Sequence, residues 1–167
     1  MNPFRINYKK SEDKVTYLLV HVLEHCQLIT DFLRLINWKQ PFKPIEMNQH
    51  FTANLQLHND FTLPVKHAYI LGISNTGQII DDALPAKEDE GHPDAYFYDE
   101  ENQVLILVEV KVGNGTLYSS QITNHKSKVS HILEQSWIHS EIAWEEIKIF
   151  LKSKLQSEQR VMNYQPI

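Results

Sequence analysis

Apolar residues recur at every third or fourth position between Ser11 and Trp38, which places them on one face of an α-helix. The pattern predicts one long helix over this stretch. Pro41 and Pro44 follow it, and a proline ends a helix or keeps a new one from starting. From Pro41 to Val65 the apolar positions show no clear period.

The middle of the chain has the pattern of short extended segments separated by polar turns. Strands are expected at Val65–Ile73, from a turn at 75–77 to Ile80, at Ala95–Tyr98 and at Gln103–Val112. An acidic loop over residues 81–90 interrupts them. Helical periodicity returns over residues 117–133 and 141–155, and the chain from about residue 157 is expected to be a tail. The pattern predicts an α/β fold, and 167 residues correspond to a single domain, 1–167.

The strongest predicted strand contains two charged residues that need an explanation. Its apolar run covers both faces from Val104 to Val112, as in a central strand that is buried on both sides. Glu109 and Lys111 interrupt that run, and because they are two residues apart their side chains leave the same face. A charged residue is tolerated in such a place when it is paired or binds a metal.

The preceding strand supplies a second carboxylate to this face. A turn at residues 99–102 would place Asp94 opposite Leu107 and diagonal to Glu109. A register shifted by two residues would put Asp94 directly opposite Glu109 and keep the face, whereas a slip of one residue would separate them. Glu-x-Lys occurs three times in the chain, but only this copy lies in an apolar strand.

Two carboxylates and one ammonium group suit a divalent cation that prefers oxygen ligands, Mg²⁺ or Mn²⁺. Such a metal acidifies a bound water and neutralises charge on a phosphate. Lys111 could orient that water, or help to deprotonate it if its own pKa is lowered. This chemistry points to hydrolysis of a phosphodiester.

The same residues resemble the two central motifs of the PD-(D/E)XK nuclease superfamily, and the chain looks like a bacterial member. The motifs are Gly91-His92-Pro93-Asp94 and, across the hairpin, Glu109-Val110-Lys111. Residues 121–125, Gln-Ile-Thr-Asn-His, resemble the helix that follows in this superfamily and often places a glutamine near the metal. The resemblance implies a restriction-endonuclease-like core of order α-β-β-β-α-β, with a mixed central sheet flanked by helices. It departs from the family in its last strand, for which residues 130–140 are a poor candidate.

The resemblance also assigns roles to single residues. Asp94 and Glu109 would hold Mg²⁺ or Mn²⁺, with the carbonyl of Val110 as a further ligand, and Lys111 would position the attacking water. Gln121 would support the site from the following helix.

A glutamate on the first helix completes the site in bacterial members. Glu12 and Glu24 are both candidates here, and Glu12 is preferred. The activity implied is Mg²⁺-dependent cleavage of DNA, in restriction, repair or defence.

Two other functions stay open. A nuclease fold that has lost catalysis could serve as a binding protein, because an acidic chain leaves little room for an element that reads DNA. The segment His21-Val22-Leu23-Glu24-His25 matches the H-x-x-E-H motif of inverted zinc peptidases. That motif needs a third protein ligand, and the sequence shows no obvious one.

Composition and charge limit the partners and the cellular location that can be expected. A formal net charge of −5 argues against binding duplex DNA by bulk charge alone, although DNA is the partner that the resemblance implies. The single cysteine, Cys26, allows no intrachain disulfide, and a cytoplasmic location is expected. No apolar run approaches the length of a membrane span. Cutting both strands of DNA usually takes two sites, which makes a homodimer an option.

Overall fold

A mixed five-stranded sheet forms the centre of the molecule, seen in a computed structural model that describes residues 11–38, 50–55, 63–82, 92–127, 129 and 137–162. The strand order is β1-β4-β5-β2-β7. The bounds are β1 Thr52–Leu55, β4 Ala95–Asp99, β5 Val104–Val110, β2 His67–Ser74 and β7 Trp137–Ala143. Two short parallel strands form a second sheet, β3 Ile79–Ile80 and β6 Leu117–Tyr118. The α/β class and the mixed sheet predicted from the sequence are confirmed.

The two central strands are buried on both faces because helices cover both. Every residue of β5 is buried, and so is every residue of β2 after His67. β2 runs parallel to both β5 and β7, while β4 is antiparallel to β5 and to β1. Near-continuous apolar sequence is what a doubly covered strand requires, so the patterns at 65–73 and 103–112 predicted these strands correctly.

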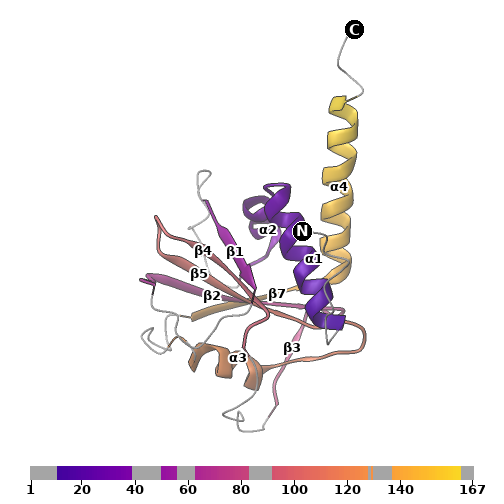
Figure 1. Cartoon of the computed structure of the whole chain (residues 1–167). Helices are drawn as coiled ribbons and strands as arrows, with labels where there is room; N and C mark the ends of the chain where they lie inside the picture. Colours follow the sequence, from indigo (N-terminus) through magenta and orange to yellow (C-terminus); the bar gives the residue numbers. More distant parts are fainter. Residues whose placement is uncertain are drawn as a thin grey trace.

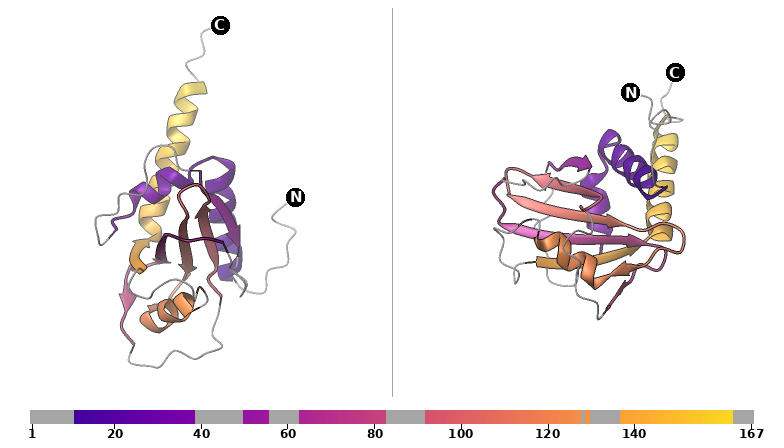
Figure 2. Two further views of the ribbon diagram at one scale, coloured as in Figure 1. Left: turned by 90° about the vertical axis from the view of Figure 1, so that its left-hand side faces the viewer. Right: turned by 60° about the horizontal axis from the view of Figure 1, so that its bottom comes forward.

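The helices divide unequally between the two faces of the sheet (Figure 1). One face packs against α1, α2 and α4, and the other packs against α3, as the two further views in Figure 2 also show. Their bounds are α1 Ser11–His25, α2 Ile29–Leu35, α3 Ser119–Ser127 and α4 Trp144–Met162. In the described part of the chain, no helix is both long and apolar enough to cross a membrane.

The long helix predicted over residues 11–38 is wrong, because two helices occupy this stretch. Gln27 has a φ of 54°, and its N–H and that of Leu28 bond back to the carbonyls of Glu24 and Leu23. These two bonds form a Schellman motif, which ends a helix and turns the chain. The turn lets both halves of the apolar pattern face one core, with Leu23 from α1 and Phe32 from α2 fully buried.

Past residue 116 the predicted boundaries need three corrections. The expected helix over 117–133 begins later, because Leu117 and Tyr118 form β6 and α3 then runs over Ser119–Ser127. The last strand, for which residues 130–140 were a poor candidate, exists as β7 at Trp137–Ala143 and includes residues 141–143, where the next helix was expected to start. Finally, α4 begins at Trp144 and continues to Met162, beyond the predicted end at 155 and into the expected tail.

Several sequence predictions fall on parts of the chain that lie outside the described residues. They include the stretch 39–49, most of the acidic loop, Gly91, and the chain after residue 162.

Candidate active site

The hairpin between β4 and β5 places Asp94 across from Glu109. Asp99 pairs with Val104 and Ala95 pairs with Val108, so the register continues to Asp94 opposite Glu109. The predicted pairing of Asp94 with Leu107 is therefore wrong by two residues. The alternative register, which places Asp94 directly opposite Glu109 on the same face, is confirmed.

The turn explains the difference in register. The strand extends through Asp99, so the connection uses residues 100–103 rather than 99–102. The buried carboxylate of Asp99 accepts hydrogen bonds from the backbone and side-chain nitrogens of Asn102, at 3.0 and 2.8 Å, and Gln103 takes a φ of 54°. A side-chain-stabilised turn of this kind fixes hairpin register.

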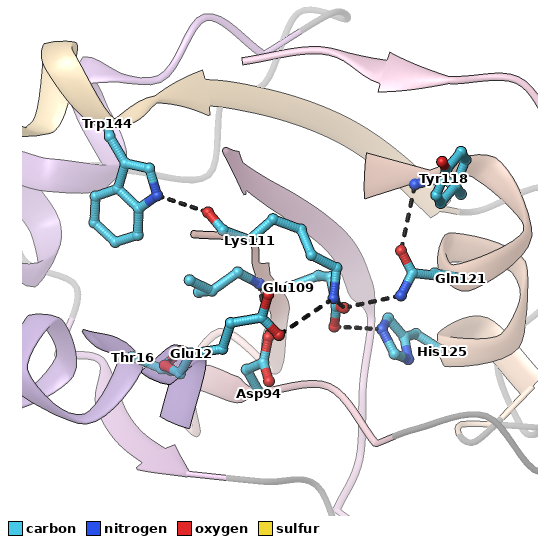
Figure 3. A network of polar contacts seen from close by, with 10 residues as sticks. Glu12, Thr16, Asp94, Glu109, Lys111, Tyr118, Gln121, His125 and Trp144 are labelled. Atoms are coloured by element: carbon cyan, nitrogen blue, oxygen red, sulfur yellow. Dashed lines mark hydrogen bonds and ion pairs between the residues drawn. The ribbon is translucent and has the colours of Figure 1, made fainter. Parts of the chain in front are cut away.

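Glu109 lies at the centre of the polar network drawn in Figure 3 and is only 4% exposed. Its Oε1 accepts hydrogen bonds from Lys111 Nζ at 2.7 Å and from Gln121 Nε2 at 3.4 Å. Its Oε2 lies 2.7 Å from His125 Nε2. Each oxygen of this buried carboxylate is thus engaged by a different set of side chains.

The start of α3 is fixed by a carboxylate from a distant part of the chain. Asp82 accepts a hydrogen bond from the backbone N–H of Ser120 at 2.8 Å and bonds to the hydroxyls of Ser119 and Ser120. An acidic group at this position caps the helix and suits its dipole. The cap sets the position from which Gln121 and His125 face the sheet.

The end of β5 is held from the opposite side of the sheet. Trp144 Nε1 donates to the carbonyl of Lys111 at 2.7 Å. The Lys111 Nζ lies 3.8 Å from Glu12 Oε2, so α1 contributes a carboxylate to Lys111 in addition to that of Glu109. Gly115 passes close by, because a Cβ there would lie 3.4 Å from Glu12 Oε1. The site therefore forms where β5 ends and α1 and α3 approach from opposite faces.

Asp94 is a partly buried carboxyl group whose ionisation is disfavoured. Its Oδ2 accepts a hydrogen bond from the backbone N–H of Val110 at 2.7 Å. Burial, followed by the negative charge of Glu109, raises the pKa of Asp94 to about 7. Repulsion between two neighbouring carboxylates is the situation that a proton or a cation relieves.

The other two charges of the network stabilise each other. Burial alone would raise the pKa of Glu109, but the hydrogen bond with His125 and the charge of Lys111 together lower it. Burial likewise opposes the charge of Lys111, but the carboxylates of Glu109 and Glu12 raise its pKa. Lys111 therefore carries its proton at neutral pH, which supports a role in orienting water and not a role as a base.

The donor set fits a hard divalent cation in its chemistry but does not form a ready-made cage. Among the described residues, no group of three or more His, Cys, Asp or Glu side chains is arranged to hold a metal ion. Mg²⁺, however, commonly binds through one or two carboxylates and keeps several waters. Asp94 and Glu109 supply such a pair, and the pKa of Asp94 is raised mainly by burial and then by the negative charge of Glu109.

The structure brings together all five side chains predicted for the site: Glu12, Asp94, Glu109, Lys111 and Gln121. Of the two candidate glutamates, Glu12 reaches the network, while Glu24 lies exposed near the other end of α1. Their catalytic role remains a prediction.

His125, which was not among the residues predicted for the site, is 2% exposed and bonds to Glu109. The available signal was its position one helical turn after Gln121.

The two histidines and the glutamate of the H-x-x-E-H segment are on the exposed side of α1. His21 and His25 stack with their ring centroids 5.7 Å apart, and Tyr17 stacks on His21 at 5.8 Å. His21, Glu24 and His25 are all exposed. Within the described ranges they do not form a group that could hold a metal, so the structure adds no support for a zinc site.

Comparison with known proteins found no match: no family model matches the chain, and neither curated proteins nor solved structures give a significant match.

Proposed function

We propose that this protein is a nuclease that hydrolyses DNA phosphodiester bonds with the help of Mg²⁺ or Mn²⁺. The observation that carries the proposal is the meeting of Asp94, Glu109 and Lys111 at the end of a buried hairpin. A structural ion pair would need one carboxylate for one lysine. Here a second carboxylate lies opposite the first, and its pKa is raised to about 7.

The order of elements supports the same class. Apart from the helices α2 and α4 and the short strands β1, β3 and β6, the chain runs α1, β2, β4, β5, α3, β7. This is the α-β-β-β-α-β order expected of a restriction-endonuclease-like core. Glu12 approaches from α1 and Gln121 from α3, so both flanking helices of that core reach the proposed site.

The roles of the side chains follow from their contacts. Asp94 and Glu109 would hold the metal, together with the carbonyl of Val110. When bound, the metal would neutralise charge on the phosphate and acidify a water. Lys111, protonated and held by Glu109 and Glu12, would donate a hydrogen bond to the attacking water and orient it.

Nicking of a supercoiled plasmid by the purified chain tests this function. Cleavage should require Mg²⁺ or Mn²⁺ and should fall about 100-fold or more in Asp94→Asn and in Lys111→Met. Lys148→Met is a matched control, because Lys148 belongs to another Glu-x-Lys sequence but lies exposed on α4. Cleavage that persists in EDTA, or that both site variants retain, would refute the proposal.

A binding protein with an inactive nuclease fold is the second candidate. The observation in its favour is that both oxygens of Glu109 are already engaged by Lys111, Gln121 and His125. In that case isothermal titration would detect no Mn²⁺ binding to the wild-type chain. The proposed nuclease should instead bind Mn²⁺, and Asp94→Ala should abolish the binding.

A further inference from the structure

The carboxylate of Glu109 is held from two sides by one face of α3. Gln121 and His125 are one helical turn apart, and the first bonds to Oε1 while the second bonds to Oε2. Gln121 is itself oriented, because its Oε1 accepts the backbone N–H of Tyr118 at 3.3 Å and so turns its Nε2 toward Glu109. Two donors on different oxygens fix the plane of a carboxylate, which a single contact would leave free to rotate.

The contact with Glu109 Oε2 gives a reason for burying an imidazole here. His125 is 2% exposed, and within the described part of the chain its Nδ1 has no hydrogen-bond partner. A hydrogen on Nε2 allows the ring to donate to Glu109 Oε2, because an ionised carboxylate oxygen can only accept a hydrogen bond. Leaving a buried carboxylate oxygen without this donor would be costly.

The contact with His125 also fixes the plane of the Glu109 carboxylate relative to Lys111. Oε1 is the atom that meets Lys111, and Lys111 in turn lies 3.8 Å from Glu12. The two oxygens are chemically equivalent, so a half-turn about the last bond would restore the same contacts, but a smaller turn would move Oε1 away from Lys111 and Oε2 away from His125 together. Figure 3 shows Lys111 and His125 on different oxygens of this carboxylate.

We propose that His125 is a positioning residue that holds Glu109 Oε2, so that Oε1 faces Lys111 and the metal-binding side of the site. This inference depends on the proposed nuclease function and assigns to it a residue that sequence analysis left outside the site. Groups that orient metal-binding carboxylates typically change metal affinity or activity 10- to 100-fold when they are removed.

The test compares His125→Leu with His125→Gln by titrating Mn²⁺ calorimetrically. Leucine removes the donor, and Mn²⁺ affinity should fall roughly 10- to 100-fold. Glutamine can place its Nε2 near the position of the imidazole Nε2, and should restore affinity to within about threefold of wild type. Affinity for a short DNA duplex in EDTA should be the same in both variants, because His125 does not reach the surface.

The outcomes separate this inference from the function on which it depends. If His125→Leu is merely less stable but binds Mn²⁺ like the wild type, His125 is structural and the positioning role is refuted. If the wild type binds no Mn²⁺, the nuclease proposal fails and the positioning role fails with it. Should His125→Leu not fold, His125→Asn replaces it, because its amide is too short to reach Oε2 and loss of affinity relative to His125→Gln is again required.

Discussion

At Asp94, folding opposes ionisation. Most acidic side chains gain a partner on folding and their pKa falls, but burial and the charge of Glu109 raise the pKa of Asp94 from 3.8 to about 7. The folded protein therefore holds a proton here more tightly than the unfolded chain does. By linkage, the contribution of Asp94 to stability is most favourable below about pH 4 and is lost as the pH rises to about 7.

Asp94→Asn should therefore stabilise the protein at pH 8 by an amount on the order of 2–4 kcal/mol. Asparagine keeps an oxygen that can accept the Val110 N–H but carries no charge to repel Glu109. Urea unfolding at pH 5, 6, 7 and 8 should show a difference between variant and wild type that grows with pH. A difference that is constant over this range would contradict the raised pKa.

Asp31 provides a control of opposite sign. Its hydrogen bond with Lys154 is the largest influence on its pKa, which is lowered. Asp31→Asn should thus destabilise the protein at neutral pH by up to about 1 kcal/mol, because the pair is partly exposed. This effect should shrink below pH 4, measured by the same unfolding experiment.

At the scale of elements, the Schellman turn between α1 and α2 is the clearest departure from the sequence pattern. The apolar spacing continues unbroken through residue 27, so periodicity alone gave no sign of the turn. Glycine is the usual residue at a left-handed position of this kind, and Gln27 supplies none of that signal. The positive φ of Gln27 costs free energy, and the packing of both helices on one face of the sheet offsets that cost.

Gln27→Gly should stabilise the protein by about 0.5–1 kcal/mol, because glycine adopts a positive φ without a steric penalty. Gln27→Ala is the matched control, since it removes the side chain but retains the Cβ that causes the strain. Thermal and urea unfolding should place the alanine variant at or below wild type. Equal stability of the two variants would show that the turn is not strained.

Gly72 in β2 is a position where a larger side chain would not fit. It lies beside Glu109 in the register, and a Cβ there would come within 2.8 Å of the fully buried Leu117, from which the chain enters α3. Gly72→Ala should cost roughly 1–3 kcal/mol by overpacking. Adding Leu117→Val should recover part of the loss in urea unfolding. A loss that Leu117→Val leaves unchanged would locate the effect elsewhere.

For the whole molecule, metal binding should appear as added stability, if the proposed function is correct. A ligand at 100 times its Kd stabilises a folded protein by about 2.7 kcal/mol. For a chain of this size, that corresponds to a rise in Tm of about 5–10 °C. Scanning calorimetry with Mn²⁺ should show this rise in the wild type and none in Asp94→Ala. A rise of equal size in Asp94→Ala would place the metal elsewhere.

Local spacing predicted the central strands and the shared face of Glu109 and Lys111, whereas Glu12 and Gln121 were assigned by the resemblance to a nuclease family. A period of two fixes which residues of β5 share a face, so Glu109 and Lys111 could be paired before any coordinates. Contacts made between distant segments could not be predicted in this way. Three features depend on how elements distant in sequence pack against one another. They are the cap that Asp82 gives to α3, the strand β7 beyond residue 136 and the burial of His125.

The parallel pairing of β2 with β7 has a consequence for biosynthesis. Every residue of the proposed site has been made once the ribosome passes codon 125, yet β2 still lacks its outer neighbour, which begins at Trp137. Until β7 pairs with it, β2 has an unpaired, apolar strand edge, the kind of surface that recruits other chains. The residues of the proposed site thus precede in sequence the strand that covers the edge of β2.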